Sequence, residues 1–207
     1  MLLLSSGCQT TYYAAMEKLG KDKRDLLRSS LEEAKEEQED ASTQFRDALF
    51  ELKELYGFSG GDLEERYESF KANYEQSKDK AERFKNRADT VDRIGSDLFR
   101  EWESELLEIS NQRLRNSSED KLAVSKRKHR QIVGALRSAE KNMDEVLVKM
   151  NDYVLFLKHN LNAQAIGSLK DEAIRLESDI VSLISDINRS VLEIQTYLND
   201  LEEAPAL

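Results

Sequence analysis

The chain has 207 residues, of which 35% are charged and 39% hydrophobic, and its formal net charge is −10. This acidic balance favours solubility and argues against general affinity for nucleic acid, whose phosphates attract basic proteins. No stretch approaches the ~18 consecutive apolar residues of a membrane-spanning helix, so no such helix is predicted.

The only cysteine, Cys8, follows a short apolar start and the small residues 5–7. Leucine, two small residues and cysteine are typical of the lipobox of bacterial lipoproteins, although here Leu4 stands one place early. A secretory signal needs a basic start and an apolar stretch of about 7–15 residues, and both are incomplete before Cys8. We therefore interpret residues 1–10 as the remnant of a lipoprotein signal, with the true start upstream of Met1. The alternative is an ordinary free thiol.

Lipidation at Cys8 implies an address in the cell envelope. Gln9 follows the cysteine where some lipoproteins carry aspartate. Glutamine there is typical of lipoproteins sorted to the outer membrane, so we expect its periplasmic face. One acyl chain anchors only marginally, whereas the two or three of a mature lipoprotein anchor firmly. The predicted membrane contact is therefore through acyl chains on Cys8.

Turn-forming residues divide the rest of the chain. We predict helices at 11–56, 62–115, 119–159 and 169–201, separated by breaks at 58–61, 116–118 and 160–168. Asp62 is expected to cap the second helix, with Glu65 completing a capping box. Residues 202–207, which include the only proline, are expected to be a disordered tail.

Each predicted helix has apolar residues at alternating steps of three and four. In the first helix these residues are Leu27, Leu31, Ala34, Gln38, Ala41, Phe45, Ala48, Leu52 and Leu55. A repeat of 3.5 residues sustained this long predicts a coiled-coil seam. Short turns between long helices make neighbours antiparallel. The predicted fold is all-α: a single elongated antiparallel coiled-coil bundle of four long helices, over residues 11–201.

Charge supports two of the helix pairings. If the first hairpin folds about residue 59, the acidic stretch 32–40 lies opposite the basic stretch 78–86. If the second folds about residue 117, the basic run 126–130 lies opposite the acidic stretch 101–108. Matched charges of this kind select partner and register more than they add stability.

These lengths predict a two-helix finger at residues 45–73, projecting beyond the third and fourth helices. The aromatic residues near its tip are Phe50, Tyr56, Phe58 and Tyr67. They are a candidate partner-docking site. Aromatic residues at heptad spacing are more often packing residues, and that interpretation stays open.

The strongest local charge feature is a basic run near the second break. Its residues are Arg113, Arg115, Lys121, Lys126, Arg127, Lys128 and Arg130. Such a run is usually a solvated face that pairs with a neighbouring helix. The functional alternative is contact with anionic lipid headgroups, worth about 1 kcal/mol per basic residue.

Signatures of catalysis and of metal or cofactor binding are not found in the sequence. No Gly-x-x-x-x-Gly-Lys-Ser/Thr loop and no Gly-x-Ser-x-Gly elbow occurs. His129 falls on the seam of the third helix and is expected to be a core residue, and His159 lies near a helix end. Neither belongs to a Glu-x-x-His or His-Glu-x-x-His motif. We therefore assign no catalytic residue, metal ligand or cofactor.

Three segments carry a resemblance to a known family. They are the Gly7–Tyr13 start, the Tyr56–Gly61 turn and the Leu161–Gly167 connector. Together they resemble an uncharacterised family of small coiled-coil lipoproteins of Gram-negative bacteria, a domain of unknown function. The resemblance implies a lipoprotein over nearly the whole mature chain. Some members carry a DNA repair ATPase label, but this chain lacks the phosphate-binding loop that such an activity needs.

Three functions remain open from the sequence. The favoured one is a non-enzymatic, lipid-anchored envelope protein that acts as a helical scaffold or spacer for an unidentified partner protein. The alternative is a cytosolic coiled-coil adaptor associated with a nucleic-acid-processing machine. An enzyme with an unfamiliar site is the third and least supported. The oligomeric state stays open.

Overall fold

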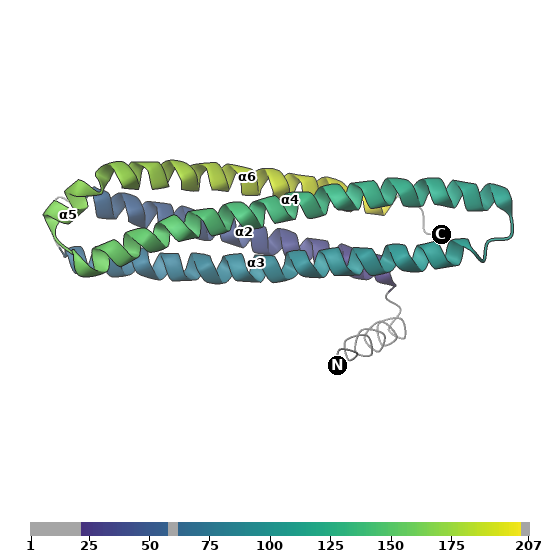
Figure 1. The fold of residues 1–207 in the computed structure, drawn as a ribbon, viewed down its shortest axis with the longest axis horizontal. Coiled ribbons are helices and arrows are strands. Elements are labelled where there is room, and N and C mark those ends of the chain that lie inside the picture. Colours follow the sequence, from purple (N-terminus) through teal and green to yellow (C-terminus); the bar gives the residue numbers. More distant parts are fainter. Residues whose placement is uncertain (1–21, 58–61, 204–207) are drawn as a thin grey trace, which may run out of the picture.

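The computed structural model describes residues 22–57 and 62–203, which form helices and no strand (Figure 1). The helices are α2 (Lys23–Tyr56), α3 (Leu63–Leu106), α4 (Gln112–His159), α5 (Ala163–Ser168) and α6 (Lys170–Glu203). The four long helices lie side by side along one axis, and α5 is a short helix in the connector between α4 and α6. The predicted all-α bundle is confirmed.

The four long helices surround one continuous core. They pack in the cyclic order α2, α3, α4 and α6, so each contacts two neighbours. Phe45, Phe84, Met143 and Ile180 are fully buried, one from each helix. All four stand on the predicted seams, because a 3.5-residue repeat keeps one apolar stripe facing the partners along the whole helix. Burial of this stripe is the dominant favourable contribution to folding.

The helix starts are set by side-chain caps. The carboxylate of Asp22 accepts a hydrogen bond from the backbone amide of Asp25 at 2.9 Å, so α2 begins at Lys23. Asp62 caps α3 as predicted, accepting from the amides of Glu64 and Glu65 at 3.0 and 3.1 Å. The predicted helical residues 11–21 lie outside the described residues, as do the signal remnant at 1–10 with Cys8, the turn residue Phe58 and residues 204–207 of the tail.

The prediction for the second break was wrong. Helix α3 ends at Leu106 rather than 115, and the turn lies at residues 107–111. Asn111 is the N-cap of α4, its side chain accepting from the amides of Arg113 and Leu114 at 3.0 and 3.3 Å. Residues 116–118 lie inside α4. The Ser118 hydroxyl accepts a hydrogen bond from the indole N–H of Trp102 in α3 at 2.8 Å, and this contact favours the helical position of Ser118.

The predicted finger at residues 45–73 was also wrong. At that end α4 and α6 extend as far as α2 and α3 do (Figure 1), and Leu52, Leu55 and Phe70 are fully buried. At the opposite end, the α3–α4 hairpin extends beyond the ends of α2 and α6 (Figure 1). The earlier turn lengthens α4 to 48 residues, so α4 reaches the first turn and, together with α3, projects past α2 and α6 at the other end (Figure 1).

We call residues 102–127 the finger. Two ion pairs mark its base, where the four-helix section ends: Lys23–Glu101 at 2.6 Å between α2 and α3, and Lys128–Asp200 at 2.6 Å between α4 and α6. A small separate core of Phe99, Leu106 and Leu122 holds the finger together, with Trp102 and Ile109 packed against it.

Ion pairs between helices agree with the register predicted for the first hairpin. Lys80 pairs with Asp40, and Arg87 pairs with Glu33 at 2.6 Å. In the second hairpin, Lys126 pairs with Glu103. Exposed pairs contribute little stability each, but together they disfavour slipped registers.

Candidate functional site in the α3–α4 finger

The structure does not bring together the aromatic residues predicted as a docking tip. Tyr67 is buried with 5% of its surface exposed, whereas Phe50 is 58% exposed on α2. The Tyr56 hydroxyl donates a hydrogen bond to the Glu177 carboxylate of α6 at 2.5 Å. Phe58 lies outside the described residues. Two of these side chains therefore serve the closure of the bundle end, and Phe50 is exposed by itself.

The Tyr56–Glu177 contact is completed by a cation. Lys53 Nζ lies 2.7 Å from a Glu177 carboxylate oxygen. The hydrogen bond to Glu177 raises the pKa of the Tyr56 hydroxyl, and the one from Lys53 lowers the pKa of Glu177. This network ties the end of α2 to the start of α6.

The basic run is distributed along α4 and only partly engaged. Lys126 and Lys128 pair with Glu103 and Asp200. The guanidinium of Arg115 donates from Nε and Nη2 to the Ile109 carbonyl at 3.0 and 2.6 Å, which holds the turn. The others are exposed and form no ion pair with residues 22–57 or 62–203: Arg113, Lys121, Arg127 and Arg130. They extend over about 26 Å of helix axis at 1.5 Å per residue, so they do not form one compact patch.

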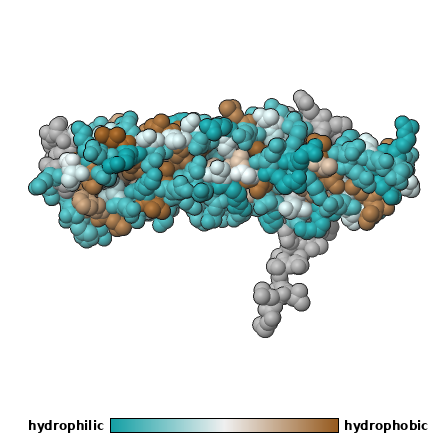
Figure 2. Space-filling model, turned by 45° about the horizontal axis from the view of Figure 1, so that its top comes forward, coloured by the Kyte–Doolittle hydropathy of each residue, from teal (hydrophilic) through white to brown (hydrophobic). Residues whose placement is uncertain are grey.

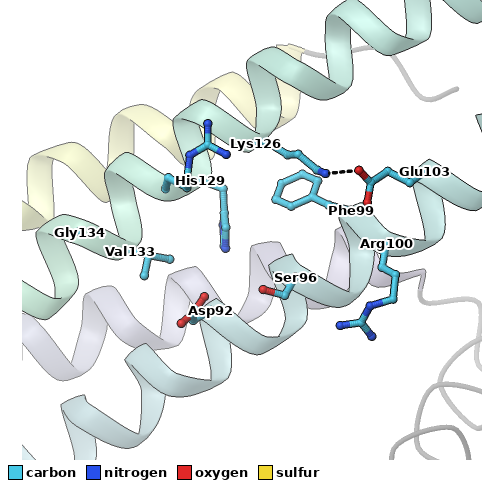
Figure 3. A pocket seen from close by; sticks show the side chains of 10 residues that line it. Asp92, Ser96, Phe99, Arg100, Glu103, Lys126, His129, Val133 and Gly134 are labelled. Atoms are coloured by element: carbon cyan, nitrogen blue, oxygen red, sulfur yellow. Dashed lines mark hydrogen bonds and ion pairs between the residues drawn. The ribbon is translucent and has the colours of Figure 1, made fainter.

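At the base of the finger, the ring of His129 points from α4 toward α3 (Figure 3). It is 4% exposed and lies edge-on to Phe99 of α3, with ring centroids 5.3 Å apart. Tyr197 of α6 lies on another side of the imidazole, with ring centroids 6.4 Å apart. A Cβ atom at Gly95 would be 2.1 Å from His129 Cε1 and 2.3 Å from Nε2. The imidazole therefore fills the space that a larger residue at position 95 would need.

Both nitrogens of His129 are buried, and no side chain among the described residues forms a hydrogen bond with them. Burial lowers the pKa of His129, and the negative charge of Asp92 and a contact with its backbone partly offset this. Burial likewise raises the pKa of Tyr197, whose hydroxyl has no hydrogen-bond partner within the described chain. The expected core position of His129 is thus observed, and its burial favours the neutral imidazole.

An open groove runs beside His129, and Figure 3 shows the side chains around it. Its polar lining residues are Asp92, Ser96, Arg100, Glu103, Lys126 and Arg130. The two carboxylates are both engaged by cations: Glu103 by Lys126, and Asp92 by Arg137, whose Nη2 lies 3.6 Å away. Within residues 22–57 and 62–203, no three His, Cys, Asp or Glu side chains are grouped to hold a metal ion. The ion pairs along the groove thus join α3 to α4.

The tip of the finger carries a feature that the sequence analysis missed. Leu107 is 78% exposed and Leu114 is 62% exposed, at the two sides of the turn. The predicted break at 116–118 had placed both leucines inside one helix. Both leucines lie outside the 3.5-residue apolar repeat, and this position could have indicated from the sequence that they are exposed. Hydrophobic residues are exposed at this end of the molecule, as they are at other places along a largely hydrophilic surface (Figure 2).

Long helices, one continuous seam core and antiparallel connections define an elongated antiparallel four-helix bundle. The family model for a protein of unknown function (DUF2959) matches residues 12–201, and the chain belongs to that family. No curated protein sequence matches the chain. Among the helices the structure describes, none combines the length and apolar character needed to cross a membrane.

Proposed function

We propose that this protein is a non-enzymatic, lipid-tethered helical rod of the bacterial envelope that holds partner proteins at a set distance from a membrane. The observation that carries the proposal is where the chain enters the rod. Lys23 begins α2 at the base of the finger, paired with Glu101. Acyl chains on Cys8, 14 residues before Asp22, would therefore attach the rod at its finger end.

Rigidity supports a spacing role. Helix α3 is continuous over 44 residues, which corresponds to about 66 Å at 1.5 Å per residue. The seam also contains buried polar contacts between α2 and α6. The side-chain amide of the fully buried Gln38 donates to Ser190 Oγ at 3.0 Å, and Ser42 Oγ donates to Asn188 at 3.2 Å. Such contacts select one register of the helices, as polar seam residues do in coiled coils.

The test is fractionation of cells that express the natural gene, with its upstream sequence, beside a Cys8→Ser variant. We expect the wild-type protein in the outer-membrane fraction, resistant to extraction by salt. The Cys8→Ser variant, with an unchanged helical circular dichroism spectrum, should leave that fraction. Wild-type protein in the soluble cytoplasm would contradict the proposal and support the adaptor alternative.

The scaffold role needs a partner. Crosslinking in intact cells should capture an envelope protein on the wild-type rod and capture less of it on the detached Cys8→Ser variant. Equal capture by both forms would show that the tether is not what positions the partner.

A further inference from the structure

We infer that the finger tip is a membrane-contact site, where Leu107 and Leu114 insert into a lipid surface of zwitterionic headgroups. The inference rests on the proposed function, because it takes the rod to be tethered at the finger end. It adds a second point of contact, which would hold the rod in one orientation.

The tip is built to present its leucines. Leu106 and Ile109 turn inward onto the finger's small core, whereas Leu107 and Leu114 are 78% and 62% exposed. The turn between them is fixed by the Asn111 cap and by the Arg115 contact to the Ile109 carbonyl. Because these contacts hold the turn backbone at both ends, the turn keeps its conformation while both leucine side chains stay exposed to solvent.

The charges near the tip favour a neutral surface. Glu105 precedes the turn, Glu108 lies in it, and Arg113 and Arg115 follow it, so residues 105–115 carry no net charge. A strongly anionic membrane would attract the arginines and repel the glutamates alike. A zwitterionic surface accommodates both signs and leaves insertion of apolar side chains as the driving force.

A second copy of the chain fits the tip less well than a membrane does. A stable protein interface buries about 1,200–2,000 Å² in total, far more than two leucine side chains supply. Two leucines are also too few to bind a free protein to lipid. They suffice when a tether keeps the tip beside the bilayer, because the second contact then becomes intramolecular. Chain from Asp22 back to Cys8 spans at most about 50 Å when extended, which keeps the finger end close to the anchor.

The single cysteine allows a direct test that does not depend on natural acylation. Cys8 of the purified full chain is coupled to maleimide-bearing lipid in phosphatidylcholine vesicles with brominated acyl chains. Leu114→Trp in a Trp102→Phe background reports insertion through quenching. The matched control is Val148→Trp in the same background, since Val148 is 61% exposed on the same helix but far from the tip.

We expect at least twofold stronger quenching for the position-114 reporter than for the position-148 reporter. Equal quenching at both positions, or none at either, would overturn the inference. A preference that appears only on anionic phosphatidylglycerol vesicles would overturn it too, and would point to the basic residues instead.

Hydrogen exchange of the unsubstituted chain provides a check in which Trp102 is kept. Coupling to phosphatidylcholine vesicles should slow exchange in residues 105–115 and leave residues 145–157 unchanged. No difference between the coupled and free protein would contradict insertion. Absence of natural acylation on Cys8 would contradict the proposed function, whereas the vesicle experiment tests only membrane insertion of the finger tip.

Discussion

His129 of α4 lies against Gly95 of α3 so closely that a Cβ atom at position 95 would be 2.1 Å from the imidazole Cε1. The two residues fix the register of α3 and α4 where the four-helix section passes into the finger. Phe99 and Tyr197 enclose the ring from α3 and α6. Moving the ring away from Gly95, toward the open groove beside it, would break its contacts with Phe99 and Tyr197.

Gly95→Ala should therefore destabilise the bundle although alanine favours helices. We expect a loss of about 1–3 kcal/mol, the range for overpacked cores. Gly134→Ala is the control, because Gly134 is exposed on α4 and a Cβ atom there would have no neighbour within 4 Å. The control should gain about 0.5–1 kcal/mol, because glycine is costly inside a helix. Urea unfolding followed by circular dichroism measures both, and equal stability of the two variants would refute the packing argument.

Acidification should weaken the same contact. Burial lowers the pKa of His129 below its ordinary value of 6.5, so between the two values the unfolded chain binds more protons than the folded one. The stabilising contribution of neutral His129 is present above pH 6.5 and is lost as pH falls through the lowered folded pKa. The difference in stability between pH 7 and pH 5 should shrink in His129→Leu and persist in His159→Gln. An unchanged difference in His129→Leu would contradict this account.

The position of the second turn can be tested at its cap. Asn111→Ala removes the acceptor for the amides of Arg113 and Leu114 and should cost about 1 kcal/mol. Asn116→Ala should change stability by less than about 0.5 kcal/mol, because Asn116 is exposed inside α4. Thermal unfolding compares the two. A larger loss for Asn116→Ala would place the turn at 116–118 instead.

The buried Gln38–Ser190 contact should show strong coupling. Ser190→Ala leaves the Gln38 amide without its acceptor in a fully buried position, at a cost of about 1–3 kcal/mol. Adding Gln38→Leu removes the orphaned group, so the double variant should regain most of that loss. A double-mutant cycle from urea midpoints measures the coupling. Additive losses would show that the two side chains do not depend on each other.

The seams were predictable from sequence because they depend only on spacing along each helix. Phe45, Phe84 and Met143 follow that spacing and are buried. The position of the second turn was not predictable from sequence, because Ser110 and Asn111 offer the same capping chemistry as the Asn116–Ser118 stretch. Two contacts between residues apart in the chain favour the turn at 107–111: the Trp102–Ser118 hydrogen bond and the Arg115–Ile109 contact. No local sequence pattern predicts either contact.

The finger was misplaced for the same reason. Which helix pair projects depends on where all four helices end, so one wrong turn moved it to the wrong end of the bundle. The Gly95–His129 contact was equally out of reach, since a fold about residue 117 places position 105 opposite His129. The exposed leucines of the tip became visible only once the turn was located at 107–111.

The most direct test of a membrane-tethered rod is the mass of the N-terminal peptide of protein purified from native membranes. The account predicts a peptide that begins at Cys8 and carries the mass of two or three acyl chains. A peptide that extends upstream of Cys8 and has a free thiol would contradict it.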